Sequence, residues 1–192
     1  MRRGFKAEAK RLALEVRDEL EVDAHAPLNP YELAALYGVA VFSLSDIAEG
    51  KSELASALAH FTSVRPDVFS AAVIPVGTGR VILENCGHDP QRRVSTLAHE
   101  MAHVVLEHSF STLLRTSGGE CRESDREQEA EAAELSGELL IPSDAALRLA
   151  YRNTPDERVA EHFGVSLKFA QWRMTATGAR IRAMRAAARR TA

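Results

Sequence analysis

The stretch Arg93–Leu106 reads RVSTLAHEMAHVVL and contains the pentapeptide His99-Glu100-Met101-Ala102-His103. Its apolar residues recur at helical spacing, which predicts a helix over Gln91–His108. On a helix, residues four apart lie one above the other, so the two histidines can direct both imidazoles at one metal ion. The glutamate between them can act as a general base. An H-E-x-x-H pattern on a helix indicates zinc-assisted hydrolysis.

A catalytic zinc ion usually has three protein ligands and one open position, so His99 and His103 need a third partner. The extended pattern with another histidine six places further on requires histidine at position 109, where the chain has Ser109, and His108 misses that register. The remaining common solution is a glutamate on the next helix, expected over Asp125–Ile141. Its glutamates are Glu127, Glu129, Glu131, Glu134 and Glu138.

Helical angles favour Glu131 among these candidates. It lies nearest the stripe formed by Leu135 and Leu139, which should face the core, but its margin over its neighbours is small. Glu127 and Glu134 therefore remain alternatives as the third ligand.

The rest of the chain predicts a mostly helical α+β fold with a small sheet. Asn29 can cap a helix that begins at Pro30, and Gly77-Thr78-Gly79 can join two strands as a hairpin. The helix that begins at Pro30 should run to Tyr37. The other helices are expected at 5–20, 47–61, 143–151 and after Pro155, and the strands at 39–42, 69–76 and 80–83. A polar loop, Ser109–Ser124, separates the two ligand-bearing helices; its Cys121 is read as an ordinary reduced cysteine.

Composition places the chain among ordinary globular proteins. Its 192 residues are 45% hydrophobic and carry a net charge of −3, which gives no general case for binding nucleic acid or an anionic membrane. There is no run of 18 apolar residues and no signal-like start, so we expect a cytoplasmic protein without a membrane partner. Two cysteines are too few for a disulfide scaffold.

Three blocks of sequence resemble the ImmA/IrrE family of bacterial zinc metallopeptidases. Arg93–Leu106 is similar to that family's approach to H-E-x-G-H, with Ala102 where glycine is usual. Glu129–Pro142, EAEAAELSGELLIP, resembles its acidic helix, which ends in two leucines, an apolar residue and proline. Val159–Arg173, VAEHFGVSLKFAQWR, resembles its C-terminal helical segment. The resemblance also takes in 28–42, so it spans most of the chain.

The resemblance implies a zincin-like metallopeptidase domain at 1–150, followed by a helical segment at 151–192 that packs on it. Counting back from the proline, the family's ligand glutamate falls on Glu131, so His99, His103 and Glu131 would hold Zn²⁺. Glu100 would take a proton from the attacking water and pass it to the leaving nitrogen. The implied substrate is a helix-turn-helix transcriptional repressor, whose cleavage derepresses a mobile element or a stress-response regulon.

Substrate placement follows as a separate hypothesis. An extended peptide could add itself to the edge of the small sheet, for which we take the strand Arg80–Leu83. His88, His108 and Tyr151 could each supply an oxyanion donor, but a lone polar residue near a helix end is more often solvated, so none of the three is assigned a role.

The alternative is a zinc-containing regulator, or a DNA- or protein-binding module, without proteolysis. Gly164, Val165 and Ser166, with apolar residues on either side, fit a helix-turn-helix. The arginines that follow are Arg173, Arg180, Arg182, Arg185, Arg189 and Arg190. In a chain with a peptidase core the same helix pair can simply pack on the core, so DNA binding is not favoured. The intact Glu100 favours the enzyme, because zinc binding alone does not need that carboxylate.

Overall fold

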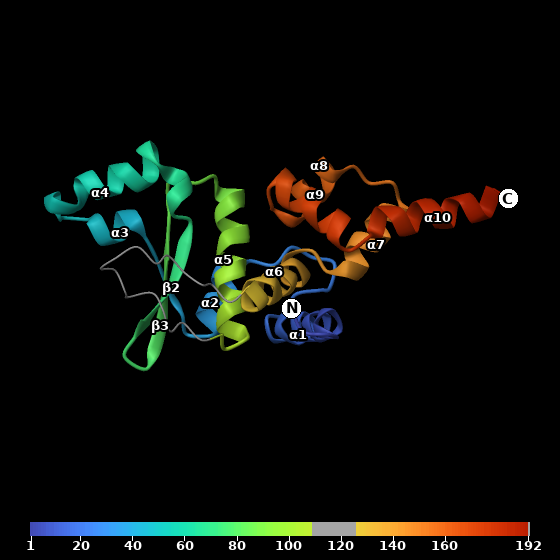
Figure 1. Ribbon diagram of the computed structural model, residues 1–192, viewed down its shortest axis with the longest axis horizontal. Helices are drawn as coiled ribbons and strands as arrows, with labels where there is room; N and C mark the ends of the chain where they lie inside the picture. The colour runs from blue at the N-terminus through green and yellow to red at the C-terminus, as the bar shows by residue number, and fades with distance from the viewer. Residues whose placement is uncertain (109–125, 192) are drawn as a thin grey trace. The chain divides into compact units, whose positions relative to one another are not determined.

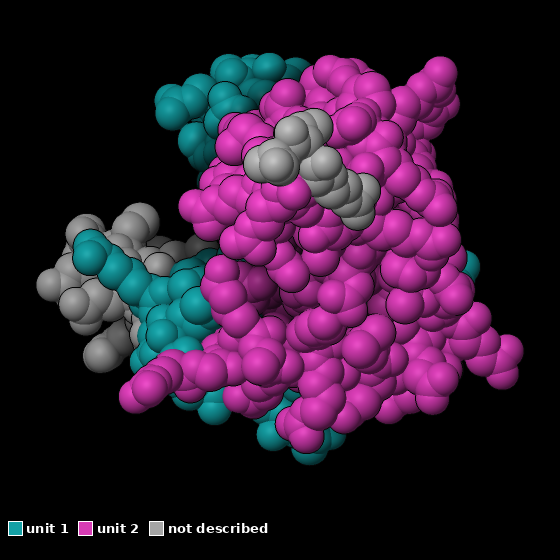
Figure 2. Space-filling model, turned by 90° about the vertical axis from the view of Figure 1, so that its right-hand side faces the viewer, with its two compact units in different colours: residues 1–2, 29–133 teal, residues 3–28, 134–192 magenta. Residues whose placement is uncertain are grey.

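The computed structural model describes residues 1–108 and 126–191. The loop predicted at Ser109–Ser124, including Cys121, lies outside the described residues. The described residues fall into two compact units, coloured separately in Figure 2: residues 1–2 with 29–133, and residues 3–28 with 134–192. The two units do not coincide with the predicted domains 1–150 and 151–192, because α1 and the second half of α6 belong to the second unit. The predicted boundary near residue 150 stays a prediction.

The first unit holds a three-stranded mixed sheet, drawn in Figure 1. Its strands are β1 (Ala40–Ser43), β2 (Ala71–Val76) and β3 (Gly79–Glu84). β3 pairs with β1 in parallel and with β2 as an antiparallel hairpin. The predicted turn is confirmed: Gly77 has φ 58°, a conformation that glycine adopts without steric cost.

The central position of β3 contradicts the expected substrate edge. Both sides of β3 are hydrogen-bonded, to β1 and to β2, so this strand has no free edge to offer a peptide. The assignment of Arg80–Leu83 as the edge strand is therefore wrong. The reason is the long crossover that brings β1 beside β3, which sequence spacing does not reveal.

Helices surround this sheet within the first unit. They are α2 (Pro30–Leu36), α3 (Leu44–Ala48), α4 (Ala55–Ala59), α5 (Pro90–Val105) and the first half of α6 (Arg126–Leu140). Shorter helical turns occupy Ser52–Leu54, His60–Val64 and Pro66–Val68. α5 packs on β2 and β3, and α2 contacts both α5 and β1. Leu33, Ile82, Leu97 and Met101 are fully buried among these elements.

Two local expectations can be compared directly with this unit. Asn29 caps α2 as predicted, accepting a hydrogen bond from the Tyr31 backbone N–H at 3.0 Å. The single helix expected over Ile47–Phe61 is instead divided, because Gly50 takes a left-handed conformation with φ 71° and breaks the backbone ladder after α3.

The second unit is all helical in its described part. Besides the second half of α6 it contains α1 (Phe5–Glu19), α7 (Ser143–Tyr151), α8 (Asp156–Phe163), α9 (Leu167–Ala176) and α10 (Ala179–Thr191). α9 packs on α8, α7 and α10. The Arg17 guanidinium of α1 donates to the Leu139 carbonyl at the end of α6, at 2.9 Å. The predicted mostly helical α+β fold with a small sheet is confirmed.

Among residues 1–108 and 126–191, no helix combines the length and the apolar character that crossing a membrane requires.

Candidate metal centre

α5 presents both histidines of the pentapeptide. Asp89 caps this helix, accepting a hydrogen bond from the Gln91 backbone N–H at 2.9 Å, and Pro90 occupies its first turn. One face of α5 is buried in the core through Leu97 and Met101, which fixes the rotation of the helix. The imidazoles of His99 and His103 then lie on a common face, with their Nε2 atoms 3.2 Å apart.

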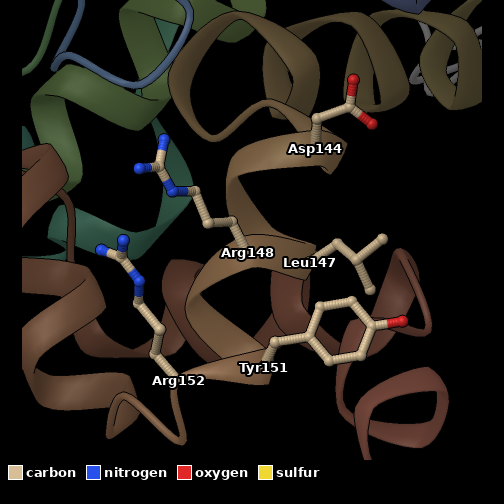
Figure 3. A pocket seen from close by; sticks show the side chains of 5 residues that line it. All are labelled: Asp144, Leu147, Arg148, Tyr151 and Arg152. Carbon is tan, nitrogen blue, oxygen red and sulfur yellow. The ribbon is translucent and has the colours of Figure 1, made fainter. Parts of the chain in front are cut away.

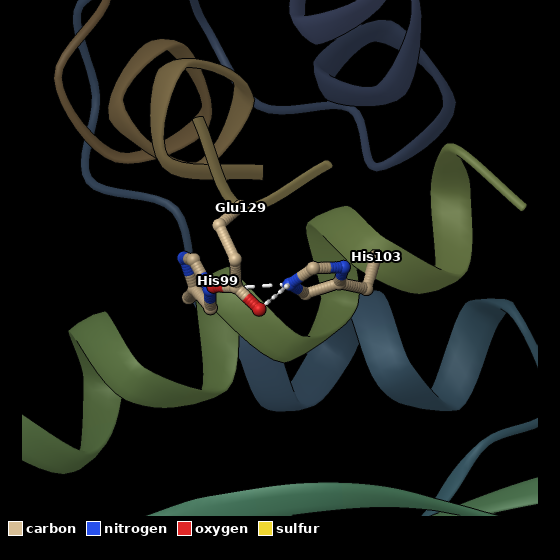
Figure 4. Close-up of side chains that lie close together, drawn as sticks. All are labelled: His99, His103 and Glu129. Carbon is tan, nitrogen blue, oxygen red and sulfur yellow. Dashed lines mark hydrogen bonds and ion pairs between the residues drawn. The ribbon is translucent and has the colours of Figure 1, made fainter. Parts of the chain in front are cut away.

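Glu129, at the start of α6, completes a three-residue cluster (Figure 4). One carboxylate oxygen lies 3.2 Å from Nε2 of His99, and the other lies 3.8 Å from Nε2 of His103. The three ligand atoms all lie within 4.8 Å of one another. Two imidazole nitrogens and one carboxylate oxygen that converge in this way match the donor set of a catalytic zinc site.

The three side chains of the cluster differ in their exposure to solvent. The His103 side chain is only 10% exposed, whereas those of His99 and Glu129 are 28% and 42% exposed. A catalytic metal needs one coordination position that a water or substrate can reach, so partial exposure of two ligands suits that use. Glu100 follows His99 on α5 and is half-buried.

Glu131 does not join this cluster in the structure. Its carboxylate accepts hydrogen bonds from the backbone N–H and from Nε of Arg2, both at 3.0 Å, and lies 3.7 Å from Nε2 of His108. The helical-angle argument placed Glu131 on the inner side of α6, and the residue is indeed buried. Its assignment as a zinc ligand stays a prediction, while the geometry brings Glu129 to the two histidines.

The other glutamates of α6 have different surroundings. Glu127 is about half exposed. Glu134 and Glu138 both lie against the guanidinium of Arg173, at 3.0 Å and 2.5 Å. The structure therefore brings neither of these last two to the histidines.

Burial and neighbouring charges shift the pKa values of two groups near the cluster, His108 and Glu131. Burial lowers the pKa of His108, although the Glu131 carboxylate opposes that shift. Burial alone would raise the pKa of Glu131, but the hydrogen bonds and charge of Arg2, with a contribution from His108, lower it overall. Near neutral pH this arrangement favours a neutral His108 beside an ionised Glu131.

Sequence reasoning missed two features of this site. Glu129 is one of the five glutamates of the acidic helix, but helical angles do not favour it. Those angles select residues that face the core, whereas the Glu129 side chain is 42% exposed. The sequence assigns His108 no role, because it misses the register of a third histidine ligand and because a lone polar residue near a helix end is more often solvated. The only sequence signal was its closeness in the chain to His103.

The other two candidate oxyanion donors, His88 and Tyr151, have different surroundings. Nε2 of His88 lies 3.2 Å from the carbonyl of Phe69 and 3.3 Å from Oγ of Ser70, at the entry to β2. Tyr151 lines a hollow along α7 in the second unit (Figure 3). The other lining residues are Asp144, Leu147, Arg148 and Arg152. With no histidine and one carboxylate, this hollow offers no zinc site.

The predicted helix-turn-helix is present as α8 and α9. Gly164 ends α8 in a left-handed conformation with φ 66°, and Ser166 caps α9 by accepting from the Phe169 backbone N–H. Two of the arginines proposed for DNA are already engaged: Arg173 is 1% exposed among α6 groups, and Arg180 pairs with Asp156. The basic surface is therefore smaller than the sequence suggests.

The fold and the cluster together define a small α+β protein whose H-E-x-x-H helix carries a candidate metal centre. A peptidase family described as the IrrE N-terminal-like domain matches residues 51–175, which is well over half of the chain and includes the pentapeptide, α6 and α8. The chain belongs to this metallopeptidase family, as its resemblance to ImmA/IrrE predicted. A comparison with curated proteins gave no match.

Proposed function

We propose that this protein is a zinc-dependent endopeptidase in which His99, His103 and Glu129 hold the ion. The observation that carries the proposal is the convergence of their three ligand atoms within 4.8 Å, inside a segment that matches a metallopeptidase family. The motif alignment would put the carboxylate ligand at Glu131 instead. We favour Glu129 because its oxygens lie 3.2 Å and 3.8 Å from the two Nε2 atoms.

Each residue then has a distinct task in peptide hydrolysis. When bound, zinc supplies Lewis acidity, which lowers the pKa of a water and polarises a carbonyl group. Glu100 accepts the proton of the attacking water and returns it to the leaving nitrogen. His99 and His103 keep a fixed separation because both belong to α5, one turn apart.

The substrate class comes from the family resemblance. We propose that the protein cleaves a helix-turn-helix transcriptional repressor and so relieves repression of a mobile element or a stress-response regulon. The free edges of the described sheet belong to β1 and β2, and an extended peptide could pair with one of them.

Cleavage of a repressor encoded beside this protein tests the function directly. The wild-type protein should produce defined fragments, whereas Glu100→Gln should bind an equal amount of zinc and produce none, because an amide cannot accept the proton. Zinc is measured by elemental analysis and cleavage by mass spectrometry. Equal cleavage by both proteins would point to a contaminating protease, and absence of cleavage by both would remove the proposed substrate.

A further inference from the structure

His108 is folded back over the last turn of α5 by a well-defined helix cap. The backbone N–H of His108 donates to the His103 carbonyl at 3.1 Å, and that of Glu107 donates to the Val104 carbonyl at 3.0 Å. This pair of bonds is the Schellman motif, in which the residue after the cap adopts a left-handed conformation. Glu107 occupies that position with φ 52°, where glycine is the usual choice.

The fold-back brings two imidazoles together behind the metal cluster. Nδ1 of His108 lies 2.8 Å from Nδ1 of His103, and the ring centroids are 4.9 Å apart. On its other side, Nε2 of His108 lies 3.7 Å from the Glu131 carboxylate. Arg2 holds the second oxygen of that carboxylate with two hydrogen bonds of 3.0 Å.

The positions of the protons follow from the chemistry of imidazole. A neutral histidine carries one ring proton, so if Nε2 of His103 donates its lone pair to a metal, its proton lies on Nδ1. Nδ1 of His108 lies 2.8 Å away and can receive that proton in a hydrogen bond, in which case Nδ1 of His108 is the acceptor. The proton of His108 is therefore on Nε2, where it faces Glu131.

Burial makes this arrangement specific. The side chains of His108 and Glu131 are only 8% and 6% exposed. Buried polar groups without partners are costly, so the low exposure of these two side chains favours the protonation pattern in which each faces a complementary group. Arg2, His103, His108 and Glu131 all belong to the first compact unit, which also contains the cluster of His99, His103 and Glu129.

We propose that His108 and Glu131 are positioning residues that orient His103 as a metal ligand through a carboxylate–imidazole–imidazole relay. The relay fixes the tautomer of His103, holds its ring with Nε2 toward His99 and Glu129, and makes that nitrogen a stronger donor. The inference rests on the proposed metal site and gives Glu131 a role other than that of a ligand.

Zinc affinity of the full-length protein, measured by competition with a chromophoric chelator, tests the relay without any substrate. His108→Phe removes the acceptor, and we expect the Kd for zinc to rise about 10- to 100-fold. His108→Asn places an amide oxygen near the position of Nδ1 and should return the Kd to within a few-fold of wild type. Glu131→Gln should raise the Kd less than His108→Phe does.

Two controls separate the relay from general packing. His88→Phe alters another buried histidine of the same unit and should leave the Kd unchanged. Glu107→Gly keeps the left-handed cap and should do the same. With cobalt in place of zinc, the visible absorption bands should shift in His108→Phe and not in either control, and circular dichroism confirms that each variant is folded.

The outcomes that overturn the proposal are distinct from failure of the proposed function. A zinc Kd in folded His108→Phe within two-fold of wild type would refute the relay, as would equal weakening by His108→Phe and His108→Asn. Complete loss of zinc in Glu131→Gln would make Glu131 a ligand and also refute it. If repressor cleavage fails but the Kd pattern holds, the relay stands and only the function falls; a wild type without zinc affinity refutes both.

Discussion

Glu129 and Glu131 are separated by one residue on α6, yet their carboxylates have different partners. Glu129 is 42% exposed and faces His99 and His103, whereas Glu131 is 6% exposed and faces Arg2 and His108. Successive positions on a helix turn by about 100°, so residues two apart point in nearly opposite directions. Only one of the two can therefore point directly at a metal ion that His99 and His103 would hold.

Single substitutions should separate these two carboxylates. We expect Glu129→Ala to lose zinc almost completely, because two imidazoles alone make a weak site, and Glu131→Ala to retain zinc with reduced affinity. Elemental analysis after dialysis against a low concentration of chelator measures both. Glu127→Ala, which alters a half-exposed glutamate one turn before Glu131, is the matched control and should keep full occupancy. The reverse result, with zinc lost from Glu131→Ala and kept by Glu129→Ala, would support the alignment over the geometry.

At the scale of the element, the two halves of α6 have different partners. Glu129 in the first half lies beside the two histidines of α5, and the glutamates of the second half pair with the guanidinium of Arg173 from α9. Arg173 is 1% exposed, pairs with Glu134 at 3.0 Å and donates to the Ile141 carbonyl at 3.0 Å. Removing one partner of such a buried pair leaves an uncompensated charge, which costs about 3–5 kcal/mol.

Gly137 explains how this guanidinium fits against the helix. A Cβ at position 137 would lie 2.9 Å from Nη1 of Arg173. In an isolated helix, Gly→Ala stabilises by about 1 kcal/mol. Here we expect Gly137→Ala to lower the free energy of unfolding by about 1–3 kcal/mol, because the buried guanidinium, which Glu134 and Glu138 hold in place, must shift to admit the methyl group. Urea denaturation measures the change.

A double-mutant comparison provides the control for Gly137. In an Arg173→Met background the clash with the guanidinium is gone, so the same Gly137→Ala change should be near neutral or stabilising. If Gly137→Ala destabilises both backgrounds equally, contact with Arg173 is not the cause.

At the scale of the whole molecule, the metal cluster belongs to one of the two compact units. His99, His103 and Glu129 all lie within 29–133, and α7–α10 lie in the other unit. A ligand that binds only the native state stabilises it by about 2.7 kcal/mol at 100 times its Kd. That stabilisation acts first on the unit that holds the ligand atoms.

Hydrogen exchange should show where this stabilisation is felt. On adding zinc, we expect slower amide exchange in α5 and in the first half of α6, and little change in α8 and α9. Exchange read by mass spectrometry, with and without a chelator, gives the comparison. Glu129→Ala should show no zinc effect in either unit. An equal gain of protection in α8 and α9 would mean that the two units respond to the metal as one.

The sequence predicted those structural features that depend on residues close together in the chain, and it missed those that depend on distant residues. The α5 helix, the cap at Asn29, the hairpin at Gly77 and the turn at Gly164 were all predicted, because each depends on residues a few positions apart. The break at Gly50 was not, since a single glycine is tolerated in many helical patterns. The order of the strands was also missed, because pairing β1 with β3 requires contacts across about 40 residues.

The sequence by itself determined the candidate donor groups and the family: an H-E-x-x-H helix, an acidic helix after it and a match to a metallopeptidase family. Local spacing suffices for that, because His99 and His103 share a helical face whatever surrounds them. Only the tertiary structure decided which carboxylate of α6 meets them and that His108 stands behind His103. Those contacts depend on how α6 is rotated against α5 and on the left-handed turn at Glu107, and neither follows from helical periodicity.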